Sequence, residues 1–159
     1  MTIAARSMFI TMLVAALIAS RPAAAAQTPS LASGGFVATS SELPYITRGY
    51  VSLWNSDSVN THWVQGSLGS YGNASNGGTI TWTVIGAGNG LQVSCYIFAI
   101  NVSTGAVYSG SGASTVATRY SFPISVAIGS GPVEATITCF LPPQSGSGVS
   151  ELNGVYYSP

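Results

Sequence analysis

Short segments in which apolar and polar residues alternate constrain the fold of this chain more than any other feature. In residues 79–84, Ile80, Trp82 and Val84 fall on one face and threonines on the other. Successive side chains of a β-strand point to opposite faces, so a period of two predicts a strand with one buried face. Three later segments share the pattern, with apolar faces made of Leu91, Val93, Cys95 and Ile97; of Val116, Tyr120, Phe122, Ile124 and Val126; and of Val133, Ala135, Ile137, Cys139 and Leu141.

Glycine-rich stretches separate these segments and predict the reversals between them. They occur at 86–90, 110–112 and 129–132, and a fourth turn ends on the glycine of 101–105. Glycine readily adopts the positive φ angles that tight turns require. Pro123 cannot donate a hydrogen bond to a sheet, which predicts an edge strand or a bulge at that position.

Shorter stretches at 35–39, 46–54, 62–66 and 149–157 predict the remaining strands, and no helix longer than one turn is expected beyond residue 26. About eight short strands separated by turns are typical of an antiparallel sandwich or a barrel. We expect the sandwich, immunoglobulin-like in the broad sense. The specific immunoglobulin pattern is absent, because Trp82 precedes Cys95 and no tryptophan lies between the cysteines.

The first 26 residues have the parts of a secretory signal peptide. A basic start ends at Arg6, an apolar run covers residues 8–19, and small residues lead up to Ala26. The apolar run is about a dozen residues long, whereas a membrane-spanning helix needs roughly 20. We expect cleavage after Ala26, a flexible leader over 27–34 and a single domain over 35–159. The protein is then secreted, extracellular or periplasmic, and has no membrane attachment after cleavage.

The two cysteines, Cys95 and Cys139, fall on the apolar faces of their predicted strands. Exported proteins meet an oxidising environment, so a disulfide between them is expected. It would close a loop of about 45 residues, for which the chain-entropy model gives roughly 4 kcal/mol of stability. Two buried thiols are the alternative. A redox or zinc site is not expected, because Cys-x-x-Cys is absent and His62 would be only a third zinc ligand.

Charged residues are scarce beyond the predicted signal peptide. The net charge there is −2, from Arg48 and Arg119 against Glu42, Asp57, Glu134 and Glu151. Nucleic acids and anionic membranes are bound by clustered lysine and arginine. Neither is therefore an expected partner.

Catalytic constellations are weak in this sequence. His62 is the only histidine, and no Gly-x-Ser-x-Gly elbow accompanies it. Asp57 and His62 share one loop and could meet, but a solvated hairpin explains them equally well. Asn55, Asp57 and Asn60 loosely resemble a calcium loop without its glycine and terminal glutamate. We expect no enzyme activity, no cofactor and no metal.

Aromatic residues flank this polar loop and predict a ligand surface. An exposed ring can stack on the C–H face of a sugar while neighbouring polar groups bind its hydroxyls. The predicted surface consists of Trp54, Asn55, Asp57, Asn60, His62, Trp63 and Tyr71. The alternative is a cross-strand pair of Trp54 and Trp63 that closes a hairpin. Trp82 is expected in the core.

Two classes of function remain open. The first is an extracellular binding or accessory module, with a polysaccharide or a surface protein as partner. The second is a structural or surface-assembly subunit of the fimbrial type, whose leader could add a strand to a neighbouring molecule.

Overall fold

The computed structural model describes residues 30–31, 35–74, 77–146 and 148–158. The expected signal peptide lies outside these residues, as does most of the expected leader. Within them, no helix is long and apolar enough to cross a membrane.

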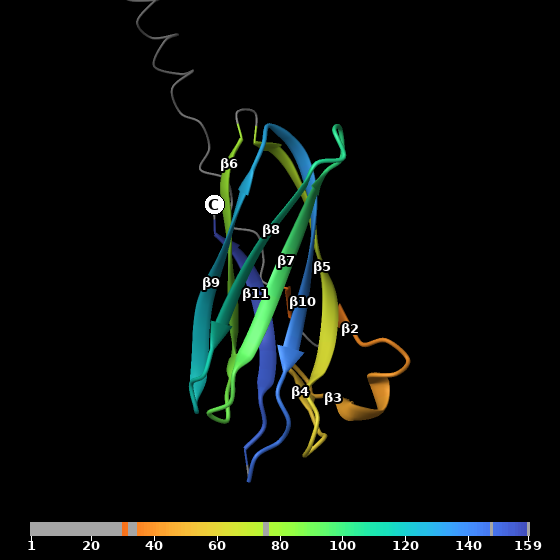
Figure 1. Cartoon of the computed structure of the whole chain (residues 1–159), viewed down its shortest axis with the longest axis vertical. Helices are drawn as coiled ribbons and strands as arrows, with labels where there is room; N and C mark the ends of the chain where they lie inside the picture. The colour runs from red at the N-terminus through yellow and green to blue at the C-terminus, as the bar shows by residue number, and fades with distance from the viewer. Residues whose placement is uncertain (1–29, 32–34, 75–76, 147, 159) are drawn as a thin grey trace, which may run out of the picture.

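Two antiparallel sheets pack face to face as a β-sandwich, which confirms the expected fold class (Figure 1). The six-stranded sheet runs in the order β3 (Ile46–Arg48), β4 (Leu53–Asn55), β11 (Glu151–Ser158), β6 (Gly78–Ala87) and β9 (Arg119–Ile128), with β1 (Ser30–Leu31) also paired to β11. The five-stranded sheet runs in the order β2 (Phe36–Val37), β5 (His62–Ala74), β10 (Gly131–Leu141), β7 (Val93–Asn101) and β8 (Val107–Ser114). One 3-10 turn, η1 (Leu43–Tyr45), precedes β3.

The core lies between the sheets and consists of the inward faces that the alternation predicted. Trp82, Ile97, Ile124 and Ile137 are fully buried, for example. Leu91 and Val116 are exceptions, because both precede their strands and are 40% and 45% exposed. The prediction that these two residues belong to the buried faces was wrong, because the ladders begin only at Val93 and Arg119.

Three details of the predicted strands were wrong. The strand expected over 62–66 extends to Ala74 as β5. Gly110 and Gly112 lie inside β8 and not at a reversal. A Cβ atom at Gly110 would lie 2.5 Å from the Ser125 carbonyl oxygen, so these glycines allow β8 to approach β9 closely. Residues 46–54 are not one strand but the hairpin of β3 and β4, closed by a 2.8 Å hydrogen bond from Gly49 N to Ser52 O.

The predictions for Pro123 and for the cysteines are confirmed. Pro123 lies on β9, which is an edge strand of its sheet. Cys95 and Cys139 form a disulfide. They stand directly opposite each other on the adjacent strands β7 and β10, so the bond links neighbouring strands of the five-stranded sheet.

Candidate functional site

Glu42, Asp57 and His62 form a partly buried group at the start of β5, which we call the His62 cluster. His62 Nδ1 lies 2.6 Å from Glu42 Oε2, and His62 Nε2 lies 2.9 Å from Asp57 Oδ2. The Tyr45 ring stacks on the imidazole with a centroid distance of 4.2 Å. Burial alone would lower the pKa of His62, but the two carboxylates together raise it above its ordinary value. The hydrogen bond from His62 holds the pKa of Asp57 well below its usual range.

The cluster is an ion-pair network and has no geometry for hydrolysis. In a serine hydrolase, one imidazole nitrogen faces the acid and the other faces the nucleophile. Here both nitrogens face carboxylates. Sequence reasoning connected Asp57 to His62 but missed Glu42, which reaches His62 from 20 positions away. Only the folding of η1 against the start of β5 brings these two residues together.

Asn55 is fully buried and serves the fold. Its Nδ2 atom lies within 3.1 Å of the carbonyl oxygens of Asn60, Leu141 and Pro142, and its Oδ1 accepts a hydrogen bond from Asp57 N at 2.8 Å. Asn60 is exposed, and its side chain donates to Asp57 Oδ2 at 3.1 Å. The amide of Asn55 therefore has no free hydrogen-bonding group for a ligand.

The three predicted aromatic residues lie in three different places. Trp54, on β4, covers the turn between β3 and β4, where a Cβ atom on Gly49 would lie 2.6 Å from its ring. Trp63 lies on β5, in the other sheet. The alternative of a Trp54–Trp63 hairpin pair is therefore wrong. Tyr71 is half-buried, and its hydroxyl accepts a hydrogen bond from Trp82 Nε1 at 2.9 Å. Trp82 is in the core, as expected.

Trp63 instead belongs to a group of aromatic residues on the outer surface of the five-stranded sheet. It stands directly opposite Phe140 on β10. Phe140 is 36% exposed, and its ring meets Tyr96 on β7 edge to face at 5.8 Å. Phe98 follows two positions along β7 and is 44% exposed, as Tyr96 is. Figure 1 shows β5, β10 and β7 side by side. We call Trp63, Tyr96, Phe98 and Phe140 the aromatic face.

A hollow of about 590 Å³ lies over Tyr96, Phe98 and Phe140 of the aromatic face. The lining combines hydroxyl and amide side chains with the rings, and consists of Thr61, Gln92, Ser94, Tyr96, Phe98, Thr138 and Phe140. None of these residues is charged. Aromatic walls with a few convergent polar groups are typical of small-ligand sites, and the volume lies within their usual range of roughly 300–1,000 Å³.

The signal for this face was present in the sequence. Because Cys95 and Cys139 point inward, the period of two already turns Tyr96 and Phe140 outward. An aromatic residue at an outward position of a strand is the feature to look for. The sequence does not reveal that β5, β10 and β7 are neighbours, and without that order the rings cannot be assembled into one surface.

The sequence matches no family model and no curated protein sequence. Two solved structures resemble the fold. An exo-β-1,3-galactanase from Phanerochaete chrysosporium with galactose is 16% identical with a TM-score of 0.45, over 86% of this chain and 30% of that chain. TmCBM61 in complex with β-1,4-galactotriose is 9% identical with a TM-score of 0.43, over 77% of this chain and 86% of that chain. This chain thus spans less than a third of the galactanase. Its functional interpretation rests on its own side chains.

Proposed function

We propose that this protein is a carbohydrate-binding module that holds a neutral polysaccharide on the aromatic face. The observation that supports the proposal is an outer sheet surface on which Tyr96, Phe98 and Phe140 are each at least 36% exposed. Large aromatic side chains normally gain stability from burial. A contiguous exposed group of them marks a binding surface.

The polar side chains between the rings suit the hydroxyls of a sugar. Ser94, Thr138 and Gln92 supply donors and acceptors within the same hollow, next to Tyr96 and Phe140. The absence of charge from the lining favours a neutral ligand. The hollow lies on the open outer surface of a sheet, which leaves room for a polymer to pass over it.

Tryptophan fluorescence of the protein against a panel of soluble neutral polysaccharides tests the proposal. Trp63 is the reporter, because Trp82 is buried and Trp54 covers a turn in the other sheet. We expect a saturable change with at least one polysaccharide. Phe140→Ala and Tyr96→Ala should each weaken binding about tenfold or more, because truncating a central aromatic contact costs roughly 2 kcal/mol.

Tyr50→Ala is the matched control. Tyr50 is 98% exposed but lies in the turn between β3 and β4, which belong to the other sheet. The Tyr50→Ala variant should bind the polysaccharide with the affinity of the wild type. If no polysaccharide binds, or if Tyr50→Ala weakens binding as much as Phe140→Ala, the aromatic face is not a sugar site.

A second function is favoured by the aliphatic residues at the other end of the same sheet. Ile100, Val102 and Val107 are 48%, 54% and 62% exposed around the turn between β7 and β8. β8 is an edge strand, which can pair with a strand of another molecule. Assembly of copies through this end is tested by sedimentation over a range of concentrations. Oligomers that dissociate in the Val107→Lys variant would support the function of a surface-assembly subunit. A monomer at every concentration would exclude that function.

A further inference from the structure

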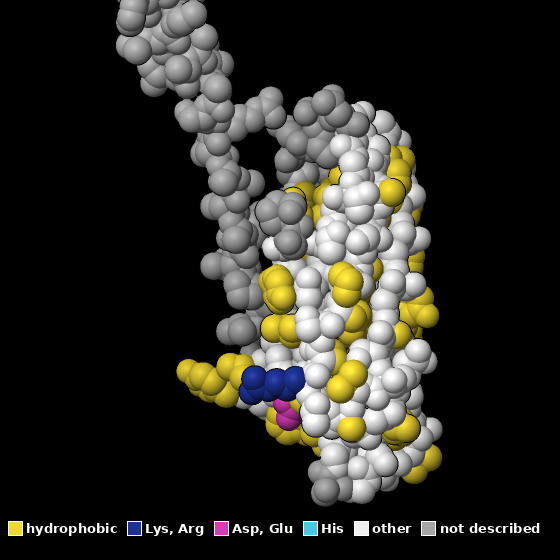
Figure 2. All heavy atoms as spheres, turned by 90° about the vertical axis from the view of Figure 1, so that its left-hand side faces the viewer, with side chains coloured by type: hydrophobic (Ala, Val, Ile, Leu, Met, Phe, Trp, Pro, Cys, Tyr) yellow, Lys and Arg dark blue, Asp and Glu magenta, His cyan; other side chains and the backbone are white. Residues whose placement is uncertain are grey.

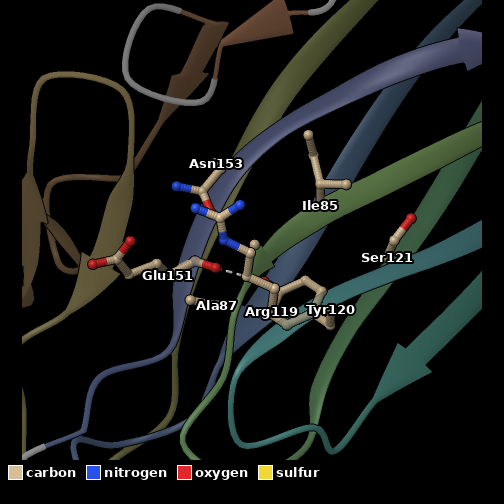
Figure 3. A pocket seen from close by; sticks show the side chains of 8 residues that line it. Ile85, Ala87, Arg119, Tyr120, Ser121, Glu151 and Asn153 are labelled. Carbon is tan, nitrogen blue, oxygen red and sulfur yellow. Dashed lines mark hydrogen bonds between the residues drawn. The ribbon is translucent and has the colours of Figure 1, made fainter.

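A second hollow lies on the outer face of the other sheet (Figure 3). Its volume is about 530 Å³, and β6, β9 and β11 build it. Arg119, Ala87 and Glu151 stand in one row across these strands, because Arg119 pairs with Ala87 and Ala87 with Glu151. The small Ala87 side chain between two long ones leaves the surface depressed at that point.

The floor of this hollow is fixed by Gly86 and Tyr120. The Tyr120 hydroxyl donates to the Glu151 carbonyl oxygen at 2.7 Å, and burial raises the pKa of Tyr120 well above its ordinary value. Both of these oxygen atoms lie where a Cβ on Gly86 would be. Any side chain at position 86 would therefore displace the floor.

A β-bulge brings a polar side chain to the hollow. The pairing of β11 with β6 shifts between Leu152 and Gly154, which leaves Asn153 as the extra residue. Bulges re-aim side chains and are frequent beside functional sites. Figure 3 shows the amide of Asn153 beside the guanidinium of Arg119, while the carboxylate of Glu151 points away from both.

Arg119 is an exposed cation on a surface that has very little charge. On the face of the molecule shown in Figure 2, basic and acidic side chains occur at a single place, in its lower part. The other described arginine, Arg48, donates to the Phe36 carbonyl oxygen at 2.9 Å. No described residue forms a hydrogen bond or ion pair with the guanidinium of Arg119. Its five donors are therefore available to a ligand.

We infer that this hollow binds the carboxylate of an acidic sugar, a uronate residue of a saccharide. The planar guanidinium of Arg119 matches a carboxylate through two parallel hydrogen bonds. Asn153 and Ser121 are placed for the ring hydroxyls, and Ile85 and Ala87 supply an apolar patch for the C–H face. One guanidinium balances the single charge of a carboxylate, whereas a phosphate dianion would leave one negative charge unbalanced.

This inference does not depend on the aromatic face, which lies on the opposite sheet and has an uncharged lining. Calorimetric titration of the protein with a uronic-acid oligosaccharide and with its methyl ester tests it. The two ligands have the same ring and differ in charge. We expect the acid to bind at least tenfold more tightly than the ester, and its affinity to fall with added salt.

Three variants locate the site. Arg119→Gln should abolish the preference for the acid over its methyl ester. Arg119→Lys should recover part of that preference, because lysine keeps the positive charge but cannot form two parallel hydrogen bonds to a carboxylate. Phe140→Ala should bind the acid as the wild type does. Because Arg119 is exposed at the start of the edge strand β9, Arg119→Gln is expected to fold, and its circular dichroism spectrum should match that of the wild type.

Each of the other results would overturn the inference. Equal binding of acid and ester would mean that no carboxylate is recognised. Equal binding of the oligosaccharide and of succinate would mean that the sugar ring is not recognised. Unchanged affinity in Arg119→Gln, or no binding at millimolar acid, would remove the site. Neutral-polysaccharide binding can persist in every one of these cases, so the two proposals fail independently.

Discussion

His62 Nδ1 lies 2.6 Å from Glu42 Oε2, and this contact joins the segment before β3 to the first residue of β5. The same carboxylate oxygen accepts a hydrogen bond from the backbone N–H of Trp63 at 3.3 Å. The His62 cluster thus fixes the backbone from which one member of the aromatic face projects.

The stability of the protein should depend on pH through this cluster. The pKa of His62 is raised above its ordinary value of 6.5, so the stability that its protonation contributes is full below pH 6.5 and is lost as pH rises through the folded pKa. The pKa of Asp57 is lowered from its ordinary 3.8, so its contribution is full above pH 3.8 and is lost as pH falls further. Thermal unfolding should show the cluster's largest effect between these two values.

Because the chain has a single histidine, the imidazole signal in a proton NMR titration reports on His62 without assignment. Its midpoint should lie above 6.5. His62→Gln should remove the fall in stability on the alkaline side. A midpoint at or below the ordinary value would contradict the assignment of His62 as a cation.

Asn55→Ala should destabilise the protein by about 3 kcal/mol, since it leaves several buried groups unpaired at roughly 1–3 kcal/mol each. Asn60→Ala is the matched comparison in the same loop. It removes one exposed hydrogen bond and should cost less than about 1 kcal/mol. Urea unfolding of both variants measures the difference. Similar values for the two would show that Asn55 is not the residue that anchors this loop to the end of β10.

Gly112→Val should destabilise the protein by about 1–3 kcal/mol, as overpacking typically does. A Cβ atom there would lie 2.8 Å from the Phe122 ring and 3.0 Å from the Pro123 carbonyl oxygen. Ser111→Val is the control, because Ser111 is exposed on the other side of β8. Chemical denaturation should separate the two variants clearly, and equal stability would mean that β8 and β9 can move apart freely.

Replacing both cysteines, in Cys95→Ala with Cys139→Ala, should cost about 4 kcal/mol, because the bond closes a loop with a sequence separation of 44. The wild-type protein with its disulfide reduced should unfold at about the same denaturant concentration as the double variant. A double variant as stable as the oxidised protein would show that neighbouring strands hold β7 and β10 together without the bond.

The sequence by itself determined which residues of each strand face the core, because the period of two is a property of the extended backbone and needs no partner. It predicted the disulfide from two cysteines on apolar strand faces of an expected exported protein, but left two buried thiols open until the structure showed the bond. The sequence could not distinguish a glycine required by a turn from a glycine inside a strand that allows another strand to approach closely. Gly110 and Gly112 were therefore expected at a reversal, although they lie within β8.

The tertiary structure alone decided which surfaces exist. Trp63 and Phe140 are 77 positions apart in sequence and become neighbours because β5 pairs with β10. Trp54 and Trp63, close in sequence, separate because the chain crosses to the other sheet between them. Strand order depends on the total apolar area that the strands bury against one another. Every strand contributes to that total, so no local segment determines the order. A local pattern therefore predicts the direction of a side chain, and only the complete sandwich determines its neighbours.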